Sequence, residues 1–511
     1  MYAHYANVKG VRKFAKYLTQ LQIVQLFGGA YMNYLSYNLE QQERYRNYAL
    51  INGLVCMSYG LMFLQFYYAK YNKKAAERAA KRASNTTEEA TEKDDKNKKD
   101  KKSRYVIIDG EQYDITGFKH PGGSVINYMS QGQNATQAFN EFHNRSKKAR
   151  KVLASLPHTK APDSGVEDPD QDLLTDFATF RQSLIDRGFF KPSYSLLIYR
   201  ILEQAVIFSF GVYMISRHVV IAVMAMGLFR ARSGWLQHEG GHNSLTGNIR
   251  IDKFIQEFFI GFGLHCSGNM WNKMHNKHHA TPQKSKYDID LDTTPLVAFY
   301  DMAVESNRRK SFSKLWLKYQ ALTFLPITSG IFVPLFWAFY LHPRQVIIDR
   351  NVTQVFFMVL SHVVPVYLFM SLGDYTFWVS LFLSSLCTWL SDMYLFGHFS
   401  LSHTTTEVIG EDENPSWVRY AVEHSVDISI GNPVVDWIMG YLNYQVIHHL
   451  FPSMPQYRGP EVAKELIVFC EKHNLTYTRI GYFEAWRQMF SNLQQVGEVY
   501  QTKDMSKAKA N

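Results

Sequence analysis

The apolar positions of this chain fall into stretches that predict membrane helices separated by soluble segments. Two stretches lie early, near residues 21–36 and 49–68, and six lie later, near 195–215, 217–229, 254–265, 321–342, 352–371 and 375–397. An α-helix needs about 20 apolar residues to cross a bilayer, so several of these stretches suffice and 254–265 is too short. The pattern therefore predicts a membrane protein that carries soluble domains.

Residues 1–72 are predicted to form a membrane helical hairpin, because the polar turn SYNLEQQERYRNY separates their two apolar stretches. Residues 73–103 follow as a charged linker, which begins KKAAERAAKR and ends DDKNKKDKK. Such a segment cannot bury enough apolar area to fold, so disorder is expected. Its basic start, next to an apolar stretch, also suits the anionic cytoplasmic face of a membrane.

A compact small domain is predicted over residues 104–158. Its first segment, YVIIDGEQYDIT, alternates apolar and polar positions as a β-hairpin does, and the Pro-Gly-Gly of ITGFKHPGG then ends that pattern. Short helical patterns follow. A second linker, residues 159–175, contains KAPDSGVEDPDQD and separates this domain from the apolar region that follows.

Residues 176–490 are predicted to form an all-α membrane bundle, with about four transmembrane helices plus re-entrant or interfacial helices, before a polar tail over 491–511. Three long apolar stretches separate the histidines at 275–279 from those at 448–449. If both sets serve one site on one side of the membrane, an even number of crossings must separate them. We expect 321–342 not to cross, because Pro326, Gly330 and Pro334 interrupt it.

Composition narrows the possible functions only modestly. The formal net charge of +10 is small for 511 residues, and nothing in the chain resembles a nucleic-acid-binding module, so no nucleic-acid partner is expected. The four cysteines are far apart and form no CxxC pair, which indicates reduced packing residues and soluble parts that face the cytosol. The N-terminal segment MYAHYANVKGVRKFAKY has no apolar core of a signal peptide.

Three groups of polar residues next to apolar stretches carry the candidate chemistry. The motifs QHEGGH, HNKHH and QVIHH place their members three and four residues apart, so each group shares one face of a helix. The members are His238 and His242, then His275, His278 and His279, then Gln445, His448 and His449. An isolated histidine is usually a hydrogen-bonded structural residue, but seven in such groups predict metal binding through neutral imidazoles. Seven imidazoles exceed the four ligands of a structural zinc ion, so we expect more than one metal ion.

In this order, and between these apolar stretches, the motifs HxxxH, HxxHH and QxxHH resemble those of the membrane fatty acyl desaturases. The glutamine of QVIHH, DIDLDTTPLVAF after the second motif and HHLFPSMP after the third resemble the front-end subgroup. The resemblance covers roughly residues 170–490. It implies a di-iron centre at the cytosolic ends of a helical bundle and O2-dependent removal of two hydrogens from a long acyl chain.

The resemblance also implies a ligand set. Its members are His238, His242, His275, His278, His279, His448 and His449, with one further ligand in FGHFSLSH, for which we expect His403 rather than His398. Gln445 fills the first position of the third motif, and we expect it to be a weak ligand or an amide that orients one. Ile447 stands where many relatives carry glutamate, which removes a carboxylate partner for a neighbouring imidazole. His265, His362 and His424 match no motif and are expected to be structural.

The segments DITGFKHPGG and NATQAFNEFH of the small domain resemble cytochrome b5, an α+β fold. The resemblance implies that His120 and His143 are the axial ligands of haem b. The expected pocket residues are Ile115, Phe118, Ile126, Phe139 and Phe142. Electrons would then pass from NADH through a separate flavin-dependent cytochrome b5 reductase to this haem and on to the iron site. The linker after Lys160 would act as a tether that raises the effective concentration of the donor.

The first 72 residues resemble the last part of very-long-chain fatty acid elongases, through RKFAKYLTQLQIVQLF and SYGLMFLQFYYAKY. The catalytic HxxHH motif of that family lies upstream of the matching stretch, and here only His4 precedes it. One interpretation is a truncated elongase that serves as an additional membrane hairpin. The other is the joining of two neighbouring lipid genes.

These observations predict a multidomain front-end desaturase of the endoplasmic reticulum membrane, multi-pass, with its catalytic and haem domains facing the cytosol. It would act on polyunsaturated acyl-CoA or acyl-phospholipid, most simply as a delta-5 or delta-6 type. A sphingolipid desaturase or an acyl hydroxylase would use the same ligands. Two other classes stay open, a haem-containing membrane electron carrier with a non-functional iron site and an elongase–desaturase fusion.

Overall fold

The computed structural model describes residues 9–39, 43–71, 104–129, 131–162, 169–285, 287–288, 293, 296–300, 316–410, 413 and 415–508. The predicted linker at 73–103 and His4 lie outside these residues. The chain divides into two compact units, one made of residues 1–102 with 366–382 and the other of residues 103–365 with 383–511. The second unit contains the small domain and all of the histidine groups.

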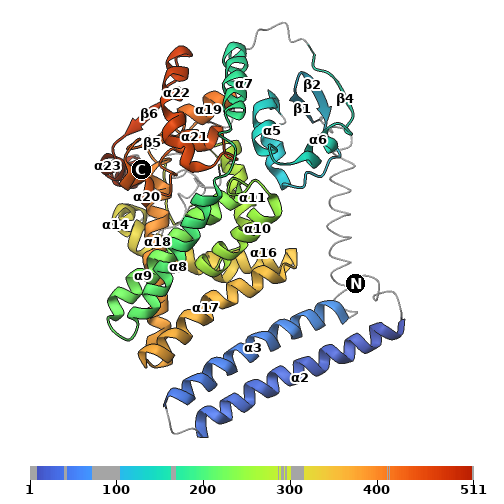
Figure 1. Cartoon of the computed structure of the whole chain (residues 1–511), viewed down its shortest axis with the longest axis vertical. Helices are drawn as coiled ribbons and strands as arrows, with labels where there is room; N and C mark the ends of the chain where they lie inside the picture. Colours follow the sequence, from blue (N-terminus) through green and yellow to red (C-terminus); the bar gives the residue numbers. More distant parts are fainter. Residues whose placement is uncertain are drawn as a thin grey trace. The chain divides into compact units, whose positions relative to one another are not determined.

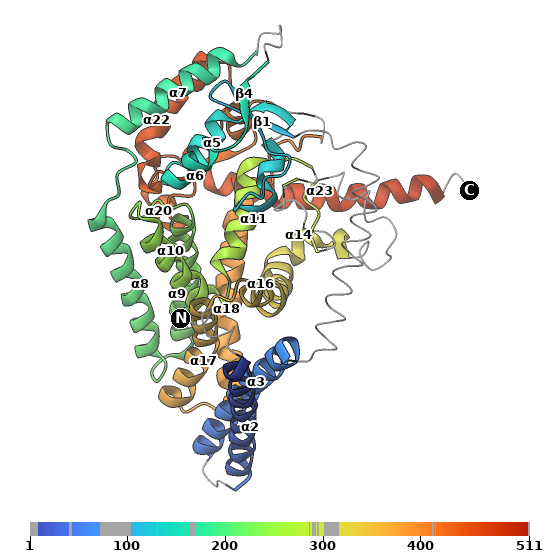
Figure 2. The same cartoon turned by 90° about the vertical axis from the view of Figure 1, so that its right-hand side faces the viewer.

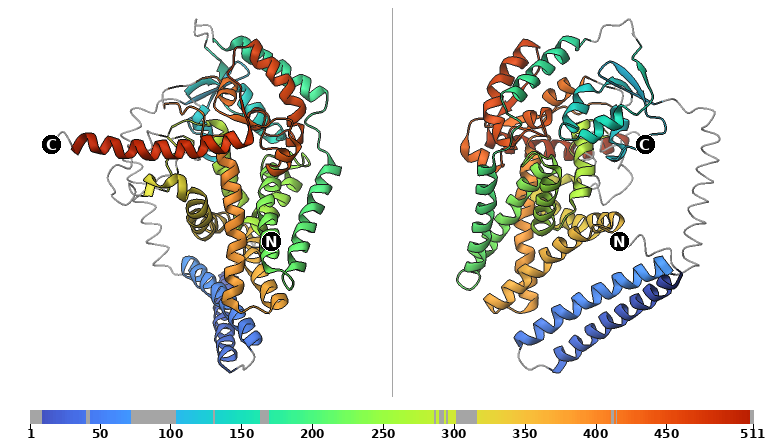
Figure 3. Two further views of the ribbon diagram at one scale, coloured as in Figure 1. Left: turned by 90° about the vertical axis from the view of Figure 1, so that its left-hand side faces the viewer. Right: turned by 45° about the vertical axis from the view of Figure 1, so that its right-hand side comes forward.

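The N-terminal hairpin consists of two long helices, α2 (Lys9–Leu39) and α3 (Glu43–Tyr71), which lie side by side (Figure 3). Their close approach depends on small residues, since a Cβ atom on Gly60 would lie 3.1 Å from the Phe27 ring. The span Arg46–Leu64 in α3 is long and apolar enough to cross a membrane. Within the described residues, α2 is not apolar enough to be a candidate span.

The small domain contains a four-stranded sheet in the order β3-β1-β2-β4. The strands β1 (Tyr105–Ile108) and β2 (Glu111–Asp114) form the predicted hairpin, joined at Asp109 and Gly110, which both have positive φ angles (53° and 76°). Strand β3 (Gln131–Asn134) pairs with β1, and β4 (His158–Lys160) pairs with β2. The helical segments η1 (Gly123–Met129), α5 (Thr136–Phe142) and α6 (Lys147–Leu153) complete the domain.

The membrane region is a helical bundle. Its long members are α8 (Tyr194–Met214), α9 (Val219–Gly241), α17 (Val352–Gly373) and α18 (Phe377–Leu401), and each is long and apolar enough to cross a membrane. Shorter elements follow α9, namely α10 (Ile249–Phe258), η2 (Phe259–Gly263) and α11 (Gly268–Ala280). Large apolar side chains of α8, such as Leu202 and Val206, are exposed, as expected of a surface that faces lipid. The protein is a multi-pass membrane protein.

The apolar stretch near 321–342 is not broken as its sequence predicts. It is a continuous helical segment made of α14 (Gln320–Thr323), η3 (Phe324–Phe332), α15 (Val333–Phe336), η4 (Trp337–Leu341) and α16 (His342–Asp349). The two η elements are π-helical turns, a wider form of helix that occurs inside α-helices without ending them. The segment also contacts α18, where the Trp389 indole donates to the Pro326 carbonyl at 2.8 Å.

This segment is also long and apolar enough to cross a membrane over Gln320–Asp349. Figures 1 and 2 show its last part, α16, lying across the direction of α8 and α9. The expectation that this segment does not cross the membrane stays a prediction. It follows from the even number of crossings that must separate the histidines at 275–279 from those at 448–449.

The C-terminal region covers one end of the bundle. It contains α19 (Trp417–Glu423), β5 (Val426–Ile428), α20 (Pro433–Ile438), α21 (Gln445–Leu450), η5 (Gln456–Arg458), α22 (Gly459–Lys472), β6 (Thr478–Ile480) and α23 (Tyr482–Ala508). Helix α7 (Gln171–Asp186) lies beside α22 (Figure 2), where the Phe180 and Phe469 rings stack 5.5 Å apart. Helix α23 continues past residue 490, the predicted start of a polar tail, and buries Leu493 and Val496.

Candidate metal centre

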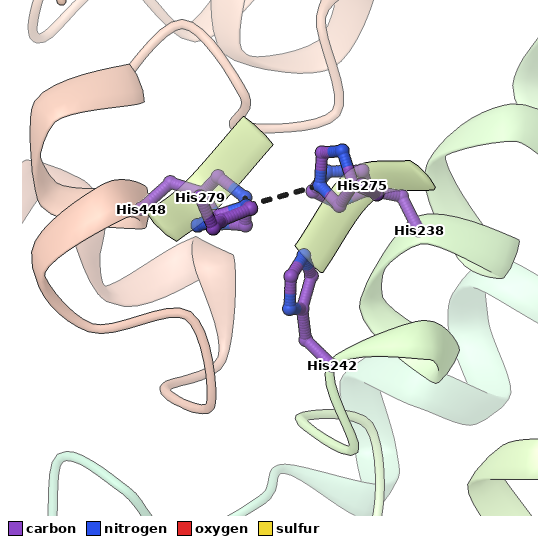
Figure 4. Close-up of side chains that lie close together, drawn as sticks. All are labelled: His238, His242, His275, His279 and His448. Atoms are coloured by element: carbon purple, nitrogen blue, oxygen red, sulfur yellow. Dashed lines mark hydrogen bonds between the residues drawn. The ribbon is translucent and has the colours of Figure 1, made fainter. Parts of the chain in front are cut away.

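Five histidines from three helices converge on one point in the second unit. Helix α9 and its C-terminal cap supply His238 and His242, α11 supplies His275 and His279, and α21 supplies His448 (Figure 4). One nitrogen atom from each ring can be chosen so that all five lie within 4.8 Å of one another. Nε2 of His279 lies 3.0 Å from Nε2 of His275 and 2.9 Å from Nε2 of His448.

A second group lies next to the first and contains His278, His403 and His449, whose nitrogens also meet within 4.8 Å. Nε2 of His278 lies 3.2 Å from Nε2 of His449. The Gln445 amide completes this group, because its Nε2 atom lies 3.0 Å from His403 Nε2 and 2.9 Å from His449 Nε2. The structure therefore gathers all eight predicted histidines and Gln445, and it divides them into a group of five and a group of three plus an amide.

The state of these rings fits metal binding. Several buried ring nitrogens have no hydrogen-bond partner, among them His238 Nε2, His242 Nε2 and His403 Nδ1. Burial lowers the pKa of His242 to about 3, and it holds the pKa values of the following rings well below the usual imidazole value: His275, His279, His403, His448 and His449. The neighbouring imidazoles lower them further. Neutral rings with converging lone pairs are the form that binds a metal ion.

Local packing explains why a glycine, Gly241, directly precedes the second histidine of QHEGGH. A Cβ atom on Gly241 would lie 2.3 Å from the Trp271 ring, so only glycine lets that indole approach. Trp271 in turn stacks on His275, with ring centroids 4.2 Å apart. The indole thus holds one candidate ligand in place, and the sequence motifs gave no indication of this role.

Three polar side chains orient the candidate ligands, and sequence reasoning missed all of them. The Asp288 carboxylate lies 3.0 Å from His278 Nδ1, the Gln456 amide 2.8 Å from His238 Nδ1, and the Ser425 hydroxyl 3.3 Å from His449 Nδ1. Each contact uses Nδ1 and leaves Nε2 of the same ring for a metal. The only available signal was that Asp288 belongs to DIDLD and Gln456 follows HHLFPSMP.

Helix α21 is fixed from its N-terminal end. The buried Asp427 carboxylate of β5 accepts a hydrogen bond from the Val446 N–H at 2.8 Å and another from the Tyr477 hydroxyl. A carboxylate at a helix N-terminus satisfies an otherwise unpaired N–H and opposes the positive end of the helix dipole. The short helix that carries Gln445, His448 and His449 is therefore held from outside the histidine motif.

Replacing Asp288 with asparagine should weaken the metal centre without unfolding the protein. The change is nearly isosteric, but it removes the charge that fixes the tautomer and raises the basicity of His278. Loss of such a partner typically costs about 10–100-fold in metal affinity or activity. The measurements are iron content and desaturation rate, with Asp186→Asn on the exposed part of α7 as the matched control. Equal iron content and rate in the two variants would contradict the role of Asp288.

The histidines expected to be structural lie outside both groups. His265 stacks on His362 with ring centroids 4.3 Å apart and contacts Arg230 and Ser361, and His424 bonds the Glu407 carbonyl at 2.8 Å. His398, the less favoured candidate of FGHFSLSH, also lies outside. Its Nδ1 donates to the Tyr394 carbonyl at 2.6 Å and its Nε2 lies 2.9 Å from the Tyr482 hydroxyl.

Ile447, which was unexplained in the sequence, has a simple structural reason. It is 2 % exposed and packs in the apolar cluster that also contains Val446, Leu450 and Phe451. The adjacent His448 and His449 belong to the histidine groups. A carboxylate partner for a ligand comes from Asp288 instead, on a different segment.

The small domain contains a pocket that fits a flat group between two imidazoles. The rings of His120 and His143 lie 5.9 Å apart, and the cavity around them is lined by all five expected pocket residues, Ile115, Phe118, Ile126, Phe139 and Phe142. A Cβ atom on Gly122 would lie 2.7 Å from the His120 ring, so this glycine keeps space for the imidazole. Burial lowers the pKa of His120 and lowers that of His143 to about 4, so both rings are neutral at physiological pH.

Comparison with known proteins agrees with this geometry. Residues 216–481 match the model of the family described as fatty acid desaturase, residues 87–160 match the cytochrome b5-like heme/steroid binding domain, and residues 1–79 match the GNS1/SUR4 family. The chain is 40% identical over 413 residues to an acyl-lipid (8-3)-desaturase of Rebecca salina, covering 80% of this chain and 95% of that protein.

Two further relatives extend the comparison. An acyl-lipid (8-3)-desaturase of Thraustochytrium sp is 37% identical over 409 residues, which is 78% of this chain and 93% of that protein. An acyl-lipid (9-3)-desaturase of Physcomitrium patens is 28% identical over 413 residues, which is 77% of this chain and 75% of that protein. The chain belongs to the fatty acid desaturase family, and it carries a cytochrome b5 domain and an elongase-family N-terminal region. The desaturase family implies a di-iron centre, and the cytochrome b5 domain implies haem.

Proposed function

We propose that this protein is a front-end acyl desaturase, which inserts a cis double bond between an existing double bond and the carboxyl end of a polyunsaturated acyl chain. The observation that carries the proposal is the division of eight histidines into two adjacent metal-binding groups. Such an arrangement is suited to two iron ions. Because imidazole ligands are neutral, the net charge of the site would come from the metal ions and not from the ligands.

In this proposal His238, His242, His275, His279 and His448 hold one iron, and His278, His403 and His449 hold the other. Gln445 acts as the weak fourth donor of the second group or orients His403 and His449. With iron bound, the centre supplies the O2-derived oxidising power that an unactivated methylene C–H bond requires. The residues of the chain contribute neutral donors, and Asp288, Gln456 and Ser425 orient them.

The reaction removes two hydrogens from the acyl chain and reduces O2 to two water molecules, so two electrons and two protons must be supplied. We propose that the electrons come from NADH through a separate flavin-dependent reductase and then through the haem held by His120 and His143. The bundle would lie in the endoplasmic reticulum membrane with the histidine groups and the haem domain facing the cytosol. The substrate would be an acyl-phospholipid or acyl-CoA.

Expression in yeast tests the proposal. Individual acids whose first double bond lies at carbon 8 or at carbon 9 are supplied, because these numbers stand in the names of the relatives. A delta-5 or delta-6 enzyme should yield a product with one new double bond on the carboxyl side, and its position is read by gas chromatography–mass spectrometry. A hydroxylated product would favour the acyl hydroxylase instead, and no product from any C18–C22 acid would contradict the proposal.

A further inference from the structure

The haem domain and the desaturase core are packed against each other rather than only joined by a chain segment. One continuous apolar cluster includes Ile115 and Ala138 of the small domain and Trp417 and Phe451 of the desaturase region. Helix α7 lies between them, and the fully buried Phe177 stacks on Phe451 with ring centroids 5.4 Å apart. Continuous burial of this kind is typical of a defined interface and not of a freely tethered domain.

Polar contacts fix the same interface on both sides of His143. The Glu141 carboxylate is buried and forms an ion pair with Arg181 of α7. Asn144 Nδ2 donates to Ser453 Oγ at 2.8 Å, and Arg145 Nη2 donates to the Ser453 carbonyl at 3.2 Å. Removing one partner of a buried ion pair leaves the other charge buried and unpaired, which is costly, so the packed arrangement requires Arg181 opposite Glu141.

The interface brings the two candidate cofactor sites close together. The Phe142 ring, next to His143, lies 6.4 Å from the His279 ring and 6.5 Å from the Trp417 ring. The Trp417 indole donates to the His279 carbonyl at 3.3 Å. The cavity around His120 and His143 is also lined by His242. The two histidine sets are thus separated by little more than a pair of aromatic side chains.

We propose that the haem domain passes electrons while it stays in this packed position. The electrons would cross the interface that α5, Asn144 and Arg145 form with α7, Trp417 and Ser453. The inference rests on the proposed function and adds where and how the internal donor docks. One haem carries one electron, and a turnover needs two. The haem therefore passes an electron twice in each turnover, and the flavin-dependent reductase reduces it each time. The opposite loop, with Gly117, Lys119 and Pro121, is exposed and is left for that reductase.

A disulfide between two introduced cysteines tests the proposal by holding the haem domain against the desaturase region. Asn144→Cys and Ser453→Cys are introduced together in a parent that carries Cys56→Ser and Cys266→Ser, because these two native cysteines are partly exposed. The control pair is Asp109→Cys with Ser453→Cys. Asp109 lies at the other end of α5, where its N–H bonds Thr136 at 2.8 Å. Oxidation should link residues 144 and 453 and not residues 109 and 453, as read by mass spectrometry of the linked peptides.

NADH and the flavin-dependent reductase then reduce the locked protein, so that both electrons of a turnover are supplied, and acyl substrate and O2 are added. We expect the haem spectrum to be unchanged. We also expect the haem to be re-oxidised only when substrate is present, and as fast as in the same variant without the disulfide. Failure of the cross-link to form, or loss of substrate-dependent re-oxidation in the locked form alone, would overturn the inference and leave the proposed function intact. A parent that makes no desaturated product would instead overturn the proposed function.

A pair of charge reversals on α7 tests the interface from the other direction. Arg181→Glu places a like charge beside the buried Glu141 and should lower both the cross-link yield and the substrate-dependent re-oxidation rate. Arg187→Glu is the matched control, because Arg187 pairs with Glu465 at an exposed position within the desaturase region. Equal effects of the two reversals would contradict the role of the Glu141–Arg181 pair in docking.

Discussion

Replacement of His403 with alanine is expected to abolish desaturation and to remove iron from the protein. His403 is buried, and its Nε2 lies beside the Gln445 amide in the group that also holds His278 and His449. Alanine leaves that group with two imidazoles and the weakly donating Gln445 amide, so we expect it to lose its iron ion. The loss should exceed the ~10–100-fold effect of removing only a supporting hydrogen bond. Iron per protein should fall from two towards one, measured by metal analysis of the purified protein.

His398→Gln is the matched control, since His398 is the other candidate histidine of the same sequence segment. A glutamine side chain can still donate to the Tyr394 carbonyl, the partner that His398 Nδ1 has at 2.6 Å. We expect two irons per protein and most of the activity in this variant. The reverse result, with iron lost in His398→Gln and kept in His403→Ala, would show that the two groups are wrongly assigned.

Replacement of His120 with alanine is expected to stop NADH-dependent desaturation while the iron content stays unchanged. His120 lies in the haem pocket, on the loop before η1, whereas the proposed iron ligands come from α9, α11 and α21 and from the segment after α18. Without one axial ligand the haem should be lost or changed to a high-spin spectrum. Electron supply then fails although the di-iron ligands are intact. The measurements are the absorption spectrum of the haem, iron per protein and product formation in a host that lacks a free cytochrome b5.

His158→Ala serves as the control in the same domain, because His158 is exposed on β4 and outside the haem cavity. It should leave the haem spectrum and the desaturation rate unchanged. Full activity of His120→Ala in the absence of a free donor would show that the internal haem does not supply the electrons.

Local sequence patterns were sufficient to predict the classes of element and the family. The β-hairpin, the long apolar helices and the three histidine motifs depend on residues within a few positions of each other, so their spacing can be read directly. The proline and glycine residues at 326, 330 and 334 misled the prediction of a break, because the chain continues through them as π-helical and α-helical turns, and Trp389 of α18 bonds the Pro326 carbonyl. The partner of a backbone carbonyl is a tertiary property.

The sequence by itself determined that eight histidines and Gln445 are metal-ligand candidates and that a cytochrome b5 domain accompanies them. Only the tertiary structure decided how the histidines divide, since His278 joins His403 and His449 while its neighbour His279 joins the other group. It also decided that Asp288 and not a residue at position 447 supplies the carboxylate, and that the haem domain packs through Asn144 on Ser453. These pairs are separated by 10 and by 309 positions along the chain. Such contacts depend on how rigid helices pack, and no local spacing encodes that packing.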